Sequence, residues 1–161
     1  MNTINIKIEM ENGRVMEAEL YPEIAPITVE NFVELIKEKF FNGIIFHRVI
    51  SGFMIQGGDP TGTGMGGSKK EIKGEFLANG VVNNLKHTRG VLSMARTMDP
   101  NSASSQFFIM HQDAPHLDGQ YAAFGKITKG IEVVDEIASV KTDFRDKPVE
   151  PQTIKEISLI D

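Results

Sequence analysis

The sequence predicts a mainly β protein, in which a closed antiparallel β-barrel carries α-helices at its ends. Three observations favour this class: many short segments alternate like strands, glycine-rich turns separate them, and only two segments have helical spacing. This pattern is also typical of β-sandwiches, so by itself it leaves barrel and sandwich open. We expect the 161 residues to form a single domain, because this length buries a sizeable core.

The first predicted element is a β-hairpin. Apolar residues alternate with polar ones over residues 4–9 and again over residues 16–20, the period of two that marks a half-buried strand. Between them stands Asn12-Gly13, a dipeptide suited to a tight turn with positive φ. Pro22 and Pro26 then end the pairing, since proline has no N–H to donate.

Two helices follow from helical spacing of apolar residues. The first is expected over Val29–Phe40 with Thr28 as its N-cap, and the second over Ile131–Ser139. Their predicted buried faces are Phe32, Val33, Ile36 and Phe40 in the first, and Val133, Val134 and Ile137 in the second. The remaining strand-like segments are Ile44–Ile50, Phe53–Gln56, Val91–Ala95, Gln106–Met110, Ala122–Ile127 and Ile154–Leu159.

Composition excludes several classes of function. The net charge of −5 and the absence of a long basic run argue against nucleic acid as a partner. With no cysteine, disulfides and thiolate chemistry are excluded. The N-terminal segment lacks the pattern of a signal peptide, and no apolar run approaches the roughly 18 residues of a membrane span. We therefore expect a cytoplasmic protein that does not enter the membrane.

The glycine-rich segment Gly62–Gly67 satisfies the spacing G-x-G-x-x-G of dinucleotide sites. That spacing has meaning only where a helix follows, and here Gly74 soon interrupts any helix. Ser68 also stands where a phosphate-binding loop needs lysine. The segment is better interpreted as a flexible loop beside a binding groove.

No metal or nucleophilic constellation stands out. The four histidines have no ligand-like spacing, and no serine lies in a Gly-x-Ser-x-Gly turn. We expect His47 to be a core histidine bonded to backbone, and His111 to lie on a loop surface. No metal and no cofactor are predicted.

One arginine stands among apolar residues in Phe46-His47-Arg48-Val49-Ile50, and strand alternation would place Phe46, Arg48 and Ile50 on one face. Arginine is rarely buried without a partner, so taken alone Arg48 is best interpreted as a structural salt-bridge residue. A permanently charged fork of donors suits electrostatic stabilisation, not proton transfer. In Ser105–Ile109, Gln106 and Phe108 share a face opposite Phe107 and Ile109.

Five ordered blocks resemble the cyclophilins, the family of peptidyl-prolyl cis–trans isomerases, and the resemblance covers nearly the whole chain. They are Phe46–Asp59, Lys86–Ala95, Ser105–Ile109, Leu117-Asp118-Gly119 and Phe124-Gly125-Lys126. The resemblance implies an eight-stranded barrel capped by two helices. It also implies an enzyme that accelerates rotation about X-Pro bonds in unfolded or flexible segments and so assists folding.

The resemblance assigns site residues position by position. Arg48 matches the catalytic arginine. The other matching positions, which line the groove or hold substrate, are Phe53, Met54, Gln56, Gly64, Ala95, Gln106, Phe108, His116, Leu117 and Tyr121. The implied partners are proline-containing peptides and unfolded proteins, and the expected state is a monomer.

Two departures bear on specificity. His116 replaces a tryptophan that helps the best-known members bind cyclosporin, so we expect weak cyclosporin binding. Arg96–Asn101 differs in length and charge from the usual Asn-Ala-Gly-Pro-Asn segment, which can alter the preferred residue before proline. Three alternatives remain: a non-catalytic proline-peptide binding module, a holding chaperone, or a scaffold that binds through the first helix.

Overall fold

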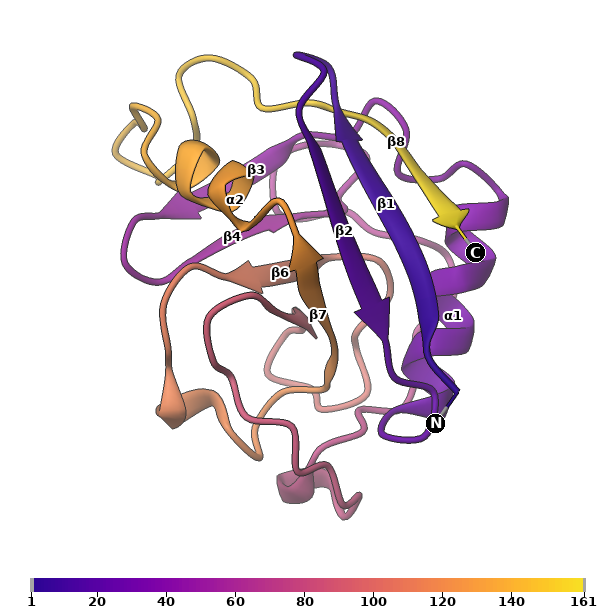
Figure 1. Cartoon of the computed structure of the whole chain (residues 1–161). Coiled ribbons are helices and arrows are strands. Elements are labelled where there is room, and N and C mark those ends of the chain that lie inside the picture. The colour runs from indigo at the N-terminus through magenta and orange to yellow at the C-terminus, as the bar shows by residue number, and fades with distance from the viewer. Residues whose placement is uncertain (1, 161) are drawn as a thin grey trace.

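The computed structural model describes residues 2–160 and contains one antiparallel sheet of eight strands (Figure 1). The strand order is β3-β4-β6-β5-β7-β2-β1-β8, with every neighbouring pair antiparallel. The strands are β1 (Ile4–Met10), β2 (Val15–Leu20), β3 (Phe46–Ile50), β4 (Met54–Gly57), β5 (Val91–Met94), β6 (Phe107–Met110), β7 (Ala123–Lys129) and β8 (Ile154–Ile160). The mainly β class with eight strands is confirmed.

The sheet curls into a half-barrel, so it is less closed than the barrel predicted from the sequence. The edge strands β3 and β8 do not pair with each other along their lengths. They approach only where residues 43–46 meet residues 152–154, through the Ile45–Thr153 bridge and the bond from Phe46 N–H to the Gln152 carbonyl (2.9 Å). A short contact of this kind joins the edges without making a continuous ladder.

The β1–β2 hairpin is confirmed. Ile6 pairs with Ala18 and Ile8 with Met16, all of them buried, so the alternating residues face the core as expected. The turn contains Gly13 at φ +88°, the left-handed region that glycine adopts without steric cost.

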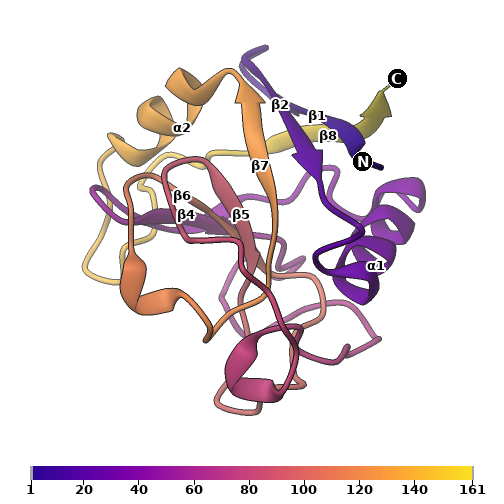
Figure 2. The ribbon, with the colours of Figure 1, turned by 60° about the horizontal axis from the view of Figure 1, so that its bottom comes forward.

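Two α-helices lie on opposite sides of the curled sheet, as both views show (Figure 2). They are α1 (Pro26–Lys37) and α2 (Ile131–Ala138), and 3₁₀ turns occur at Leu77–Asn79 and Pro115–Leu117. The second helix agrees with its prediction, and its three expected apolar residues are buried.

The first helix begins and ends earlier than predicted. Pro26 occupies the first turn, where a missing N–H is tolerated, and Phe40 lies beyond the helix end. Thr28 is therefore inside the helix, not its N-cap. The buried Glu75 carboxylate, distant in sequence, accepts the N–H groups of Ile27 and Thr28 at 3.2 and 2.7 Å. Sequence periodicity could not reveal a cap supplied from another segment.

Side chains on the two faces of the sheet form separate apolar clusters. The inner cluster centres on Phe32 of α1, whose ring meets Phe107 edge-on at 5.2 Å. The outer cluster consists of Met54, Val91, Phe108, Met110, Ala114, Leu117 and Ala123. Because alternate residues of β6 enter different clusters, Phe107 supports the core while Phe108 is available to a surface site.

Candidate functional site

Arg48 leaves the core through an irregularity in β3. The register shifts between Phe46, which pairs with Gly57, and Arg48, which pairs with Gln56, so one extra residue separates them. This bulge puts the two side chains in different environments: Phe46 is fully buried and Arg48 is exposed. The predicted shared face of Phe46 and Arg48 is therefore wrong.

The Arg48 guanidinium makes no ion pair and no side-chain hydrogen bond within residues 2–160. This finding disfavours the structural salt bridge that the residue alone would suggest. Arg48 lines a small surface cavity, so its donors remain available to a ligand there.

That cavity has a volume of about 130 Å³ and collects most of the sequence-predicted site. Its lining consists of Arg48, Phe53, Met54, Gln56, Ala95, Arg96, Phe108, Leu117 and Tyr121. We call it the proline cavity, because the resemblance found in the sequence implies that these positions hold a proline-containing peptide. Phe108 and Leu117 belong to the outer apolar cluster, while the Tyr121 ring meets Phe108 edge-on at 5.7 Å. The lining therefore places the apolar side chains of Phe108 and Leu117 beside the unpaired guanidinium of Arg48.

A buried polar chain supports the floor from behind. The His87 ring is stacked on Phe108 at 6.0 Å and bonds Asp118 through Nδ1 (3.0 Å) and Ser93 through Nε2 (2.8 Å). Burial lowers the pKa of His87 even though Asp118 opposes that shift. The order Asp–His–Ser resembles a nucleophile chain, but Ser93 is fully buried, so a substrate cannot reach its hydroxyl.

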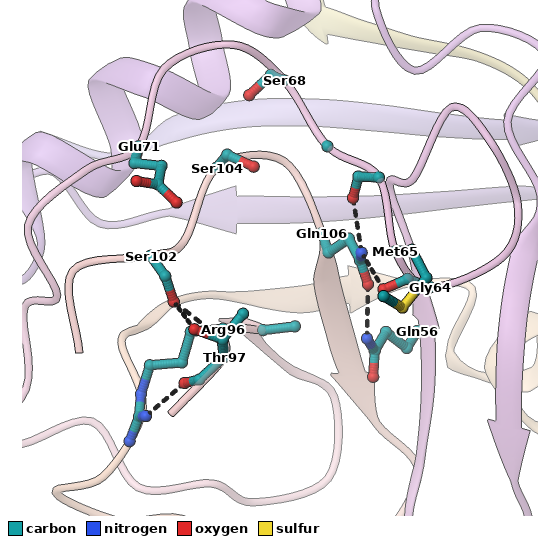
Figure 3. A pocket seen from close by; sticks show the side chains of 13 residues that line it. Gln56, Gly64, Met65, Ser68, Glu71, Arg96, Thr97, Ser102, Ser104 and Gln106 are labelled. Carbon is teal, nitrogen blue, oxygen red and sulfur yellow. Dashed lines mark hydrogen bonds between the residues drawn. The ribbon is translucent and has the colours of Figure 1, made fainter. Parts of the chain in front are cut away.

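A second cavity of about 310 Å³ is shown in Figure 3. It adjoins the first, because Gln56, Ala95 and Arg96 line both. Gln56 donates to Gln106 Oε1 at 2.9 Å, and Gln106 Nε2 donates to the carbonyls of Gly64 (3.0 Å) and Gly66 (2.8 Å). The Gln106 amide is therefore fully engaged in bonds within the protein, and it holds Gln56 in place. The predicted Gly64 lines this larger cavity, not the proline cavity.

The glycine-rich loop does lie beside a groove, and Asp59 holds it there. The buried Asp59 carboxylate accepts the N–H groups of Thr61, Thr63, Gly64 and Gly66. Burial opposes ionisation, but the N–H groups of Gly66, Thr61 and Gly64 and the Thr61 hydroxyl lower the pKa of Asp59 to about 2. The carboxylate therefore stays charged and keeps the carbonyls of the loop turned toward Gln106.

The histidines behave differently from their predictions in two places. His47 is buried as expected, yet its Nδ1 has no hydrogen-bond partner within residues 2–160, and burial lowers its pKa. His111 is not a surface residue, since its side chain is only 13% exposed and bonded on both sides. His116 is exposed and lines neither cavity, but its ring stacks on Phe53 at 5.8 Å.

Arg96 is a site residue that the predicted set omitted. It lines both cavities, and its guanidinium carbon lies 4.7 Å from the Tyr121 ring centroid and 4.8 Å from that of Phe76. The unusual length and charge of the segment Arg96–Asn101 was the only signal in the sequence. Which rings the guanidinium would meet depends on segments that the fold brings together.

Residues 2–160 contain no group of three or more side chains that could hold a metal ion. In the same part of the chain, none of the helices has the length and apolar character needed to cross a membrane.

Known proteins are similar to this chain in sequence. The family model described as cyclophilin type peptidyl-prolyl cis-trans isomerase/CLD matches residues 5–159. The peptidyl-prolyl cis-trans isomerase ppi1 of Schizosaccharomyces pombe is 44% identical over 157 residues, covering 96% of this chain and 99% of the relative. The peptidyl-prolyl cis-trans isomerase-like 1 of Gibberella zeae is 41% identical, covering 99% and 96%.

Solved structures agree. A cyclophilin type peptidyl-prolyl cis-trans isomerase of Cryptosporidium parvum superposes with a TM-score of 0.91 at 34% identity, covering 99% of both chains. A crystal structure of that protein in the presence of the dipeptide Ala-Pro gives 0.89 at 35% identity, covering 98% of this chain and 99% of the other.

Proposed function

The chain belongs to the cyclophilin-type peptidyl-prolyl cis–trans isomerases, and we propose that Arg48 and the proline cavity carry out its reaction. The reaction is rotation about the peptide bond that precedes proline. The observation that carries the proposal is an unpaired guanidinium in the lining of a cavity that also contains the apolar side chains of Phe108 and Leu117. In this assignment the proline ring enters the cavity and the rotating bond lies at Arg48.

The chemistry of the bond explains why a donor suffices. Amide resonance gives the C–N bond partial double-bond character and a rotational barrier of about 18–20 kcal/mol. In the twisted transition state the prolyl nitrogen regains its lone pair and can accept a hydrogen bond. A guanidinium N–H directed at that nitrogen stabilises the twisted state more than the planar one, which lowers the barrier. No covalent intermediate is needed.

The walls of the cavity supply binding. Phe108 and Leu117 give an apolar floor, Phe53 and Tyr121 stand at the sides, and Met54 is buried beneath them. We assign the proline ring to this floor because burying apolar surface stabilises the complex by about 25 cal/mol per Å². A crystal structure of the Cryptosporidium relative was obtained in the presence of the dipeptide Ala-Pro, which contains an X-Pro bond of the kind proposed here as substrate.

Gln56 and Gln106 have different roles in this proposal. Gln56 donates one N–H to Gln106 and lines both cavities, so its side-chain oxygen can accept an N–H of the substrate backbone. Gln106 is occupied by Gln56 and the loop carbonyls, so it acts by fixing Gln56. Gly64 and Ala95 complete the wall on this side, and His116 acts through its stacking on Phe53.

The proposed substrates are X-Pro segments of peptides and of unfolded or flexible proteins. We also propose that residues 1–161 form one isomerase domain, and that the protein is a cytoplasmic monomer that binds cyclosporin weakly. One continuous sheet enclosing the inner core supports the single domain.

Substitution of Arg48 separates catalysis from simple binding. We expect Arg48→Ala to lower kcat/KM for an X-Pro peptide by about 100-fold or more, as loss of one preorganised donor does elsewhere. Arg48→Lys keeps the charge but loses the planar fork of donors, so its kcat/KM should also fall. Exchange between cis and trans peptide, followed by NMR at micromolar protein, measures both rates. Unchanged exchange in Arg48→Ala, with peptide still bound, would refute this assignment and favour a binding module.

A further inference from the structure

The turn between β3 and β4 carries Phe53 into the wall of the proline cavity and is held by His111. The Gly52 N–H donates to His111 Nδ1 at 2.9 Å, and the His111 N–H donates to the Phe53 carbonyl at 2.9 Å. Gly52 has φ +82° and is exposed, as is Ser51. His111 therefore binds the peptide group before Gly52 through its ring and the peptide group after Phe53 through its backbone N–H.

The other side of the imidazole faces helix α2. His111 Nε2 lies 3.0 Å from Asp135 Oδ1, and Arg89 binds the same carboxylate with two hydrogen bonds of 2.7 and 2.8 Å. Arg89 also donates to the His111 carbonyl at 3.0 Å. The Arg89 guanidinium lowers the pKa of Asp135, so the carboxylate is charged.

These contacts fix the tautomer of the ring. Because Nδ1 accepts the Gly52 N–H, the proton of the neutral imidazole is on Nε2, where it is donated to Asp135. Both ring nitrogens are then satisfied, in a side chain that is only 13% exposed.

We propose that His111 is a positioning residue of the isomerase: its ring accepts the Gly52 N–H and so holds the turn that carries Phe53 into the wall of the proline cavity. The proposal rests on the function assigned to that cavity. Phe53 is only partly buried, and its aromatic neighbour His116 is exposed, so side-chain packing alone holds it weakly. The bond from the Gly52 N–H to the His111 ring, added to the backbone bond between residue 111 and the Phe53 carbonyl, supplies the missing constraint.

Two substitutions test the two contacts of the ring separately, because each keeps one contact and removes the other. In His111→Asn the side-chain oxygen occupies the place of Nδ1 and can accept the Gly52 N–H. In His111→Gln the side-chain nitrogen reaches the place of Nε2 and can donate to Asp135, but the Gly52 N–H loses its partner. His111→Ala removes both contacts.

Expected results follow from the Gly52 contact. His111→Ala and His111→Gln should raise KM for an X-Pro peptide by about 3- to 10-fold, the range for one lost hydrogen bond, with little change in kcat. The KM of His111→Asn should stay near the wild-type value, because its side-chain oxygen still accepts the Gly52 N–H. The Gly52 amide should exchange faster with solvent in the Ala and Gln variants only, as measured by NMR. Arg14→Ala, which removes the exposed Arg14–Glu136 ion pair of α2, is the control and should leave KM unchanged.

A purely structural role predicts another pattern. If the Asn and Gln variants lose stability equally in urea and neither changes KM, the proposal is overturned. It is also overturned if the Gln variant binds peptide as wild type does. Absence of isomerase activity in the wild type would refute the proposed function instead. The positioning role would then be judged by affinity for a peptide containing Ala-Pro, which the Gln variant should weaken and the Asn variant preserve.

Discussion

The guanidinium of Arg96 lies over the ring of Tyr121, with 4.7 Å between the guanidinium carbon and the ring centroid. The same carbon lies 4.8 Å from the centroid of the Phe76 ring, and the Gln120 carbonyl accepts two of the guanidinium N–H groups at 2.7 and 3.2 Å. Arg96 is thus anchored while it holds Tyr121 at the side of the proline cavity. This relationship links an unusual segment of the sequence to the shape of the site.

We expect Arg96→Ala to weaken substrate binding. A cation–π contact contributes about 0.5–2 kcal/mol, so loss of the contact to Tyr121 should raise KM by roughly 2- to 30-fold. The turnover number should change less, because Arg48 is untouched. Initial rates over a range of X-Pro peptide concentrations give both constants.

Arg96→Lys is the matched control for charge. A lysine ammonium keeps the positive charge but cannot lie flat between two rings. If Lys restored full affinity, charge and not stacking would be the cause, and the proposed wall at Tyr121 would have to be abandoned.

The second prediction concerns Asp59 and pH. Its pKa is lowered to about 2, so the ionised form stabilises the fold by about 2 kcal/mol above the pKa of an unfolded aspartate. That contribution is lost as the pH falls from about 4 through about 2. Asp59→Asn should lower the free energy of unfolding by about this amount at neutral pH and flatten its pH dependence in the acid range. Urea unfolding at several pH values measures both.

Asp143 offers the comparison for this experiment. Its carboxylate also accepts backbone N–H groups, those of Arg145 and Lys147, but in an exposed loop. Asp143→Asn should therefore lower the free energy of unfolding much less than Asp59→Asn does. Equal losses in the two variants would contradict the role assigned to burial at Asp59.

The third prediction concerns cyclosporin. His116 lies beside Phe53 where the cyclophilins best known for binding the drug have tryptophan, so the wild type should bind cyclosporin weakly. His116→Trp should tighten binding by about 10-fold or more, since a tryptophan adds apolar contact area and an N–H donor. Inhibition of isomerase activity by the drug measures the effect. A submicromolar inhibition constant for the wild type would contradict this expectation.

The sequence by itself determined the family, the strand pattern and most of the residues around the proline cavity. Local periodicity was enough for this where neighbouring residues decide the outcome: the β1–β2 hairpin at Gly13, the apolar face of α2, and the separation of Phe107 from Phe108. These depend on backbone geometry and on alternation across a strand.

Only the tertiary structure decided the contacts between distant segments. The bulge in β3 that exposes Arg48 depends on pairing with β4, and the start of α1 depends on Glu75. Likewise, His111 was expected on a surface because nothing near it in the sequence indicates Gly52 or Asp135. Hydrogen bonds and stacking need atoms within a few ångströms, and for residues far apart in sequence only the folded chain brings those atoms together.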